Sequence, residues 1–331
     1  MSGIVTVIGA GAFGTAFATV LANNNFEVKL WCYEQEVAQD ILKNKENFKY
    51  LPNIKLSSNI IPTNNLQEAL LGSTWVFEAI PVKFLRQILF EVKKFRKKDQ
   101  IFVVLSKGIE QKTFFLPSNI IKNVLGTNTK IGVVSGPNFA QELANQCYSA
   151  STVACCNIDL TQELAQNLKN SYFMPYMSCD VIGIQVAGAL KNVLVLIVGI
   201  ARGYLSSQNT IAFLLTRGFA EMAEICKFLG GESKTTYGLS GLGDLFLSSS
   251  SLQSRNMTVG QLLGEGKSLQ EIEKILGILP EGINTVQSVY QLIQKHNLNL
   301  PVCTGIYQII FENRSFNNFL DDIMNSDLVW E

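Results

Sequence analysis

The chain of 331 residues has little histidine and no net charge. Its one histidine, His296, lies in the polar stretch QKHN, where we expect it at the surface. Acid–base chemistry in this protein would therefore have to use a lysine or a carboxylate. Lys and Arg total 27, and Asp and Glu also total 27, so the formal net charge is zero. Such a chain has no long-range positive field to attract nucleic acid or anionic lipid, and we expect neither as a partner.

The cysteines argue against two further kinds of site. No pair has the C-x-x-C spacing and the number is odd, so the pattern indicates neither a zinc site nor a disulfide framework, and we expect no bound metal. Most of them lie in apolar runs, as small core residues do, which favours a reducing, cytoplasmic setting. They are Cys32, Cys147, Cys155, Cys156, Cys179, Cys226 and Cys303. The first three residues, MSG, lead directly into a strand without a basic segment, so no signal peptide is expected.

A glycine-rich turn stands near the start of the chain. Ile4 to Ile8 is a short β-branched run typical of a buried parallel strand, and an apolar helix pattern runs from Thr15 to Asn24. Between them, Gly9, Gly11 and Gly14 have the spacing G-x-G-x-x-G. The first glycine permits a tight turn, the second lets the backbone approach a pyrophosphate, and the third allows close packing of helix on strand. Because a helix N-terminus also offers free N–H groups to phosphate, the segment predicts a dinucleotide site.

Glu34 bears on which dinucleotide is bound. The second expected strand, Glu27 to Cys32, is followed by Tyr33 and Glu34, and the carboxylate comes about 20 residues after Gly14. There it would accept hydrogen bonds from the adenosine ribose and repel a 2′-phosphate, so it favours NAD over NADP. No arginine stands nearby in the sequence to reverse this preference. An ordinary glutamate at the start of a helix fits the same residues, and both interpretations stay open.

Strands and helices alternate through the first half of the chain. Repeated strand–helix units build a parallel, doubly wound sheet, and ligands bind outside the carboxyl ends of its strands. Pro81, Lys107 and Gly136 are expected at such ends. The strands are expected at 74–80, 101–105 and 131–134, with helices at 85–95 and 138–145, and strand-like runs at 151–156 and 172–177 would extend the sheet.

Helical patterns dominate from residue 181 onward. We therefore expect an α/β fold of two parts: an N-terminal Rossmann-type domain, residues 1–180, and an all-α C-terminal domain, residues 181–331. The connection at 178–180 is short, so the domains should dock tightly, with a site between them. The helices are expected at 181–201, 210–229, 256–264, 269–276, 284–295 and 303–312.

Lys191 interrupts the most apolar stretch of the chain, VIGIQVAGALKNVLVLIVGIA, residues 181 to 201. The stretch is long enough for a membrane span, but Gln185, Lys191 and Asn192 are polar and isolated charge inside a membrane is costly. A helix buried between the two domains is the better interpretation. Because a buried lysine without a partner is strongly disfavoured, we expect Lys191 to face a cleft and to have a partner. The alternative is a lysine whose amine extends to the surface.

Two later segments could complete such a site. In GLSGLGD, residues 238 to 244, three glycines precede Asp244, a candidate partner for Lys191, although a plain interhelical loop fits the segment too. Ser254 can cap the next helix, and Arg255 and Asn256 follow it. A helix N-terminus with a guanidinium group makes a phosphate site plausible, the alternative being a cap beside a surface arginine.

These segments together resemble the bacterial type of NAD(P)-dependent glycerol-3-phosphate dehydrogenase, over nearly the whole chain. The motifs that carry the resemblance occur in the order GAGAFGTAFA, SKGIE, SGPNFAQELA, VAGALKNV, TRGFAEM, GLSGLGDL, QSRN and LPEGINT. The resemblance implies a reversible reduction of dihydroxyacetone phosphate to sn-glycerol 3-phosphate, a precursor of phospholipids, with NAD or NADP as the cofactor.

The resemblance also implies roles for single residues. Lys191 matches the catalytic lysine, and Lys107 matches a residue that contacts both cofactor and substrate. The expected substrate site comprises Lys107, Gly136, Asn138, Lys191, Asn192, Asp244, Ser254, Arg255 and Asn256. The expected cofactor site, including the residues derived above, comprises Gly9, Gly11, Ala12, Phe13, Gly14, Tyr33, Glu34, Pro81, Lys107, Ala140, Arg255, Leu279 and Glu281. Asn138 replaces the usual serine or threonine, and Tyr33-Glu34 replaces an arginine that is often present.

We expect Lys191, Lys107 and Asp244 to be the catalytic residues. A hydride would reach the C2 carbonyl, and Lys191 would supply the proton as general acid, or remove it as general base in reverse. Lys107 and Asn192 would help to polarise or hold the reacting oxygen. Asp244 would orient Lys191 and raise its pKa, whereas burial lowers it, and the sequence does not decide which effect is larger.

Two other functions fit parts of the pattern. A 3-hydroxyacid dehydrogenase also uses a lysine–asparagine pair on a central helix, but acts on a carboxylate rather than a phosphate ester. A dinucleotide sensor would bind NADH without turnover and would not need Lys107, Lys191 and Asp244 together. The apolar helical half also predicts a homodimer.

Overall fold

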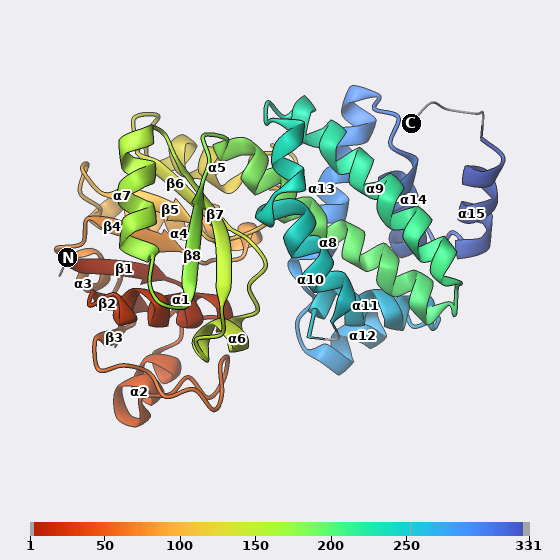
Figure 1. The fold of residues 1–331 in the computed structure, drawn as a ribbon. Helices are drawn as coiled ribbons and strands as arrows, with labels where there is room; N and C mark the ends of the chain where they lie inside the picture. The colour runs from red at the N-terminus through yellow and green to blue at the C-terminus, as the bar shows by residue number, and fades with distance from the viewer. Residues whose placement is uncertain (1–2, 252, 327–331) are drawn as a thin grey trace.

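The computed structural model describes residues 3–251 and 253–326, and the strands within residues 4–177 form one sheet (Figure 1). Its eight strands have the order β3-β2-β1-β4-β5-β6-β7-β8, in which the order reverses between β1 and β4. The strands are β1 (Ile4–Ile8), β2 (Glu27–Trp31), β3 (Ile60–Thr63), β4 (Trp75–Glu78), β5 (Ile101–Val104), β6 (Ile131–Ser135), β7 (Ser149–Cys155) and β8 (Phe173–Met177).

Helices cover both faces of this sheet, so alternate strand residues enter two apolar layers. Trp75 and Phe77 of β4 pack with one layer, and Val76 between them packs with the other. The helices are α1 (Ala12–Asn23), α2 (Gln35–Asn44), α3 (Leu66–Leu70), α4 (Val82–Phe95), α5 (Pro117–Leu125), α6 (Ala140–Ala144) and α7 (Ile158–Leu168). The first layer includes residues of α1, α2, α6 and α7, and the second includes residues of α3, α4 and α5. The expected doubly wound sheet is confirmed.

One strand pair departs from the expected parallel sheet. β7 runs antiparallel to β6, with Ser135 opposite Thr152, while β8 is parallel to β7. A parallel connection must return the chain along the whole strand, usually by a crossover helix. The expected helix 138–145 is only the five residues Ala140–Ala144, about 7.5 Å of helix. The chain therefore reverses its direction after β6, and β7 begins at the end of the sheet where β6 finishes. β3, α3, α5 and α7 had no counterpart among the expected elements.

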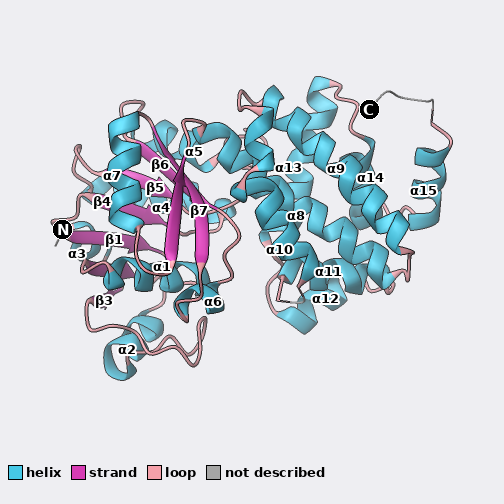
Figure 2. Ribbon diagram, viewed as in Figure 1, coloured by secondary structure: helices cyan, strands magenta, loops and turns pink. Residues whose placement is uncertain are grey.

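The second half of the described chain is helical, as expected (Figure 2). Its main helices are α8 (Val181–Gly203), α9 (Gln208–Phe228), α10 (Asp244–Ser250), α11 (Arg255–Gly264), α12 (Leu269–Leu276), α13 (Glu281–His296), α14 (Pro301–Phe311) and α15 (Phe316–Met324). The alternative of a plain loop before Asp244 does not hold, because Leu239–Gly243 forms a helical turn that leads directly into α10. Neither α10 nor α15 was expected.

α8 is the central helix of the second domain and reaches the sheet. It packs against α9, α10, α11 and α13 of the helical domain, and it also contacts β6 and β7 of the sheet. Glycine at positions 199 and 188 allows two of these contacts, because any side chain there would clash with its neighbour. A Cβ on Gly199 would lie only 2.5 Å from Met257 O of α11, and one on Gly188 only 2.7 Å from Ser135 Oγ at the end of β6. α8 is long and apolar enough to cross a membrane. However, 89% of the residues in its apolar 18-residue stretch are buried inside the protein, as in a core helix.

Candidate active site

A carboxylate bridges two lysines where the two domains meet. Lys107 Nζ lies 2.6 Å from Asp244 Oδ2, and Lys191 Nζ lies 3.1 Å from Asp244 Oδ1. Lys107 follows β5, Lys191 lies in the middle of α8, and Asp244 is the first residue of α10. The structure thus brings together the three residues that were expected to be catalytic.

The glycine-rich segment before α10 places Asp244 against its neighbours. A Cβ on Gly241 would lie 2.0 Å from Thr236 O, so only glycine fits where these two stretches of backbone meet. The resulting tight helical turn ends at Gly243 and leaves Asp244 only 2% exposed. Lys107 Nζ also donates to Gly136 O, 3.3 Å away, which joins the loops that follow β5 and β6.

Burial and the charge of Asp244 act in opposite directions on Lys191. Burial lowers the pKa of Lys191, Asp244 raises it, and the nearby charge of Lys107 lowers it again; the net pKa lies below the ordinary value. Burial alone would raise the pKa of Asp244, but Lys107 and Lys191 hold it below its usual range. The cluster therefore carries an excess of positive charge when all three groups are ionised, which suits an anionic ligand.

Ser248 is a site residue that the sequence analysis missed. Lys191 Nζ donates to Ser248 Oγ at 2.7 Å, and Ser248 Oγ lies 3.4 Å from Asp244 Oδ1. The two residues are four positions apart on α10 and so lie on the same helix face. The signal was this i, i+4 spacing, which the sequence analysis did not use because it predicted no helix over residues 244–250.

Several polar atoms around the cluster have no partner among the described residues. Asn256 Nδ2 donates to Asn192 Oδ1 at 2.9 Å, but Asn256 Oδ1 is buried without a hydrogen bond. Asn138 Nδ2 donates to Ser151 Oγ at 2.6 Å, and Asn138 Oδ1 is likewise unpaired. The other two such atoms are Ser135 Oγ, beside Gly188, and Ser240 Oγ, in the turn before α10. An unmade buried hydrogen bond costs about 1–3 kcal/mol, so each of these atoms lowers the stability of the fold unless a further partner reaches it.

The N-termini of two helices adjoin this region. Ser254 caps α11 by accepting a hydrogen bond from Met257 N, and Arg255 begins the helix. The exposed Arg255 guanidinium donates to Ile278 O, next to Leu279. Glu281 begins α13, and burial raises its pKa to about 7. A Cβ on Gly108 would lie 3.1 Å from Glu281 Oε1, so this carboxyl group adjoins the loop that carries Lys107.

The glycine turn after β1 has the geometry expected of a dinucleotide site. Gly9 has φ +111°, and a Cβ on Gly14 would lie 1.9 Å from Gly9 O, so turn and helix are in close contact. A Cβ on Gly11 would meet nothing within 4 Å, which leaves open space beside the N-terminus of α1. Ala12 and Phe13 form the first turn of α1, and Lys107 Nζ lies 6.0 Å from the centre of the Phe13 ring.

Three other residues expected at the cofactor lie in the sheet domain, each near the end of a strand or the start of a helix. Pro81 is the residue before α4, and Ala140 begins α6 and packs against the first apolar layer. Tyr33 is 77% exposed beyond β2. None of the three has a described contact with the lysine–aspartate cluster.

Glu34 is paired with a cation that its sequence neighbourhood did not reveal. Lys49 Nζ lies 2.7 Å from Glu34 Oε1, and Tyr50 Oη donates to Glu34 Oε2 at 2.9 Å. The hydrogen bond from Lys49 lowers the pKa of Glu34 against the effect of its partial burial. The sequence analysis favoured NAD over NADP partly because no arginine stands near Glu34 in the sequence. That argument was incomplete, because folding brings Lys49 to this carboxylate. Glu34 also directly precedes α2, as the alternative interpretation stated.

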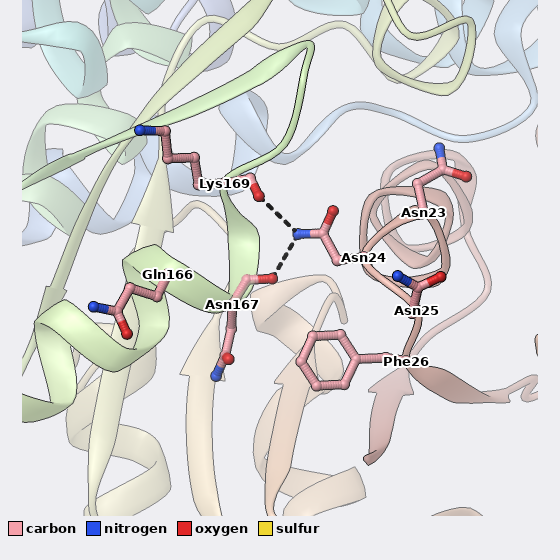
Figure 3. A pocket seen from close by; sticks show the side chains of 7 residues that line it. All are labelled: Asn23, Asn24, Asn25, Phe26, Gln166, Asn167 and Lys169. Carbon is pink, nitrogen blue, oxygen red and sulfur yellow. Dashed lines mark hydrogen bonds between the residues drawn. The ribbon is translucent and has the colours of Figure 1, made fainter. Parts of the chain in front are cut away.

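The larger of two described cavities lies away from this site. It measures about 340 Å³ and is lined by residues at the C-terminal end of α1 and of α7, whereas the glycine turn adjoins the N-terminal end of α1 (Figure 3). Asn24 closes part of it by donating to the carbonyl groups of Asn167 and Lys169. A second cavity of about 240 Å³ includes Val82, Lys83, Ile109 and Glu281 in its lining and therefore adjoins the site.

Two family models match the chain over nearly all of its length. The N-terminal model of NAD-dependent glycerol-3-phosphate dehydrogenase matches residues 4–161, and the C-terminal model matches residues 180–321. The chain belongs to this family. The protein is thus a glycerol-3-phosphate dehydrogenase that uses NAD(P), which leaves no support for the hydroxyacid dehydrogenase and the sensor considered above.

Individual relatives agree with the family assignment. Glycerol-3-phosphate dehydrogenase [NAD(P)+] from Bacillus pumilus is 35% identical over 97% of this chain and 93% of its own length. The enzyme from Syntrophomonas wolfei is 36% identical over 97% of this chain and 94% of its own length. Among solved structures, glycerol-3-phosphate dehydrogenase from Coxiella burnetii superposes with a TM-score of 0.93 at 30% identity and covers 98% of this chain and 99% of its own.

Asp244→Asn should destabilise the dehydrogenase strongly. The substitution leaves Lys107 and Lys191 close together without a counter-charge, and removal of one partner of a buried ion pair costs about 3–5 kcal/mol. We expect the free energy of unfolding, measured by urea denaturation, to fall by about this amount. Glu232→Gln is the matched control because its partner Lys234 is 83% exposed, and it should change stability little. Equal stability of Asp244→Asn and wild type would contradict the pairing.

Proposed function

We propose that this dehydrogenase reduces dihydroxyacetone phosphate to sn-glycerol 3-phosphate, with Lys191 as the general acid in this direction and the general base in the reverse one. The observation that carries the proposal is a partly desolvated amine at the domain boundary, held by Asp244 and Ser248. Because burial lowers the pKa of Lys191, its proton can be transferred more readily than that of a solvated lysine.

The residues around the glycine turn fit a nicotinamide dinucleotide. Open space beside Gly11 and the tight contact of Gly14 with Gly9 leave room for a pyrophosphate at the N-terminus of α1. We propose Gly9, Gly11, Gly14, Ala12 and Phe13 as the residues that hold it. When bound, the reduced nicotinamide supplies the hydride.

The substrate would be held by the polar groups that surround Lys191. We propose that Arg255 and the N-terminus of α11 bind the phosphate, with Asn256 beside them. Lys107 would stabilise the negative charge that develops on the reacting oxygen. Asp244 would keep both lysines in place, and remote binding of the phosphate would position the reacting carbon. We propose that Gly136, Asn138, Asn192 and Ser254 belong to the same site.

The biological setting is a further part of this proposal. A homodimer is consistent with exposed apolar side chains on the helical domain, such as Leu205 and Phe246, which are 91% and 73% exposed. A reducing cytoplasm is consistent with the free cysteines of the described chain. There the product would supply glycerophospholipid synthesis. The mass of the protein in solution, measured by light scattering, tests the dimer.

Lys191→Ala should abolish most of the turnover with dihydroxyacetone phosphate. Loss of a general acid lowers kcat by about 10²- to 10⁴-fold, measured as oxidation of NADH and of NADPH in parallel assays. The variant should still bind NADH, as observed by quenching of its fluorescence, because Lys191 is not assigned to the cofactor site. Lys234→Ala, which changes an exposed lysine, serves as the control. Turnover within about twofold of wild type would exclude Lys191 as the acid, since proton transfer contributes far more than that.

We also propose that Glu34 favours NADH and that Lys49 moderates this preference. The carboxylate would repel a 2′-phosphate, but the adjacent ammonium group offsets part of its charge. Glu34→Gln should therefore shift the ratio of kcat/KM for NADPH to that for NADH upward by about tenfold, the effect of roughly 1.4 kcal/mol. Glu36→Gln, at an exposed position of α2, is the control. An unchanged ratio would mean that Glu34 does not contact the adenosine ribose.

A further inference from the structure

Glu78 is a buried carboxyl group that the proposed mechanism does not use. It is the last residue of β4, is 1% exposed, and pairs with Ile8 of β1 and Val104 of β5 in the sheet. The strand order reverses between β1 and β4, so Glu78 stands beside the crevice in which doubly wound sheets bind their ligands. By strand alternation its side chain lies on the same face as Val76, in the apolar layer that includes Val104.

The carboxyl group of Glu78 joins the loops that follow two neighbouring strands. Ser106 Oγ donates to Oε1 at 2.6 Å, and Ile80 N donates to Oε2 at 3.3 Å. Leu105 N donates to the main-chain oxygen of Glu78 at 2.9 Å. Ser106 directly precedes Lys107, and Ile80 directly precedes Pro81. One side chain thus connects the loop that carries Lys107 to the loop that leads into α4.

Stability alone gives no reason for an acid at this position. Burial raises the pKa of Glu78 to about 8, and no ion pair with a described cation offsets the cost of burial. The carboxyl group is therefore mostly neutral near pH 7. Apolar side chains in place of both Glu78 and Ser106 would avoid that cost, since replacing both partners of a buried polar pair by apolar groups is often neutral. The contacts of Glu78 instead determine where the next residues of the loop lie.

We propose that Glu78 is a positioning residue, which holds Ser106 so that the amine of Lys107 lies against Asp244. Lys107 Nζ contacts both Asp244 Oδ2 at 2.6 Å and Gly136 O at 3.3 Å, and its main chain directly follows the serine that Glu78 binds. The inference rests on the proposed role of Lys107 in turnover. Displacement of a catalytic group by about 1 Å can cost up to 10²-fold in rate, so loss of this connection should be visible in kcat.

The test uses six variants of the full-length enzyme, assayed for NADH oxidation with dihydroxyacetone phosphate. Glu78→Leu removes both hydrogen bonds, whereas Glu78→Gln can accept from Ile80 N and donate to the freely rotating Ser106 hydroxyl. Ser106→Ala removes the partner instead. Glu221→Gln is the matched control: Glu221 is a carboxyl group 5% exposed and raised in pKa to about 7, but it accepts from Val302 N and Cys303 N at the start of α14.

We expect Glu78→Leu and Ser106→Ala each to lower kcat by about 10- to 100-fold and to change the KM for NADH much less, in protein that urea denaturation shows to be folded under the assay conditions. The double variant should lose little more than either single variant, because the two changes remove one shared contact. Glu78→Gln should restore most of the wild-type kcat, and Glu221→Gln should leave kcat unchanged.

A folded Glu78→Leu with wild-type kcat overturns the inference, as does a Glu221→Gln that loses as much kcat as Glu78→Leu. Should Glu78→Leu fail to fold, Ser106→Ala decides alone: a lowered kcat supports the positioning role and a wild-type kcat refutes it. Lys107→Ala separates the two proposals. If it keeps full turnover, the proposed role of Lys107 has failed; if it loses turnover and Glu78→Leu does not, only the role of Glu78 has failed.

Discussion

The contact of Asp244 with Lys107 and Lys191 is the interaction on which the site depends. One lysine comes from the sheet domain and the other from the central helix of the helical domain, and the carboxylate of a third element holds both amines within 3.1 Å of its oxygens. An amine buried in an apolar helix is tolerated because this carboxylate partly offsets its desolvation. The same pairing therefore connects the two domains and places the charged groups of the site.

Close backbone contacts make this arrangement geometrically possible. At Gly188 the central helix meets the end of β6, and at Gly241 the segment before α10 meets Thr236 O, in both cases closer than a side chain would allow. Lys191 is one helical turn beyond Gly188, so it lies at the boundary rather than deep in the helical core. The glycines thus act on the site through packing, without contributing a reactive group.

The carboxyl groups around the site differ in their pKa: that of Asp244 is lowered, and those of Glu78 and Glu281 are raised. Asp244 stays ionised because two ammonium groups hold its pKa low, whereas burial raises the pKa of Glu78 to about 8 and that of Glu281 to about 7. Near pH 7 Glu78 is mostly neutral and Glu281 carries only part of a charge, so both repel an anionic substrate or cofactor less than an ordinary carboxylate does. The site combines a surplus of positive charge at its centre with uncharged hydrogen-bonding groups around it.

Local sequence patterns determined much of this protein before any coordinates: the glycine turn after β1, the strand ends at Pro81 and Lys107, the helical second half and a partnered Lys191. Each depends on residues close together in the chain, whose spacing reflects the period of a strand or helix. Tertiary structure alone decided the antiparallel pairing of β7, the role of Ser248, the lysine beside Glu34 and the net lowering of the Lys191 pKa. These features depend on distances between segments far apart in sequence and on how much water each group loses, and neither quantity is encoded in local spacing.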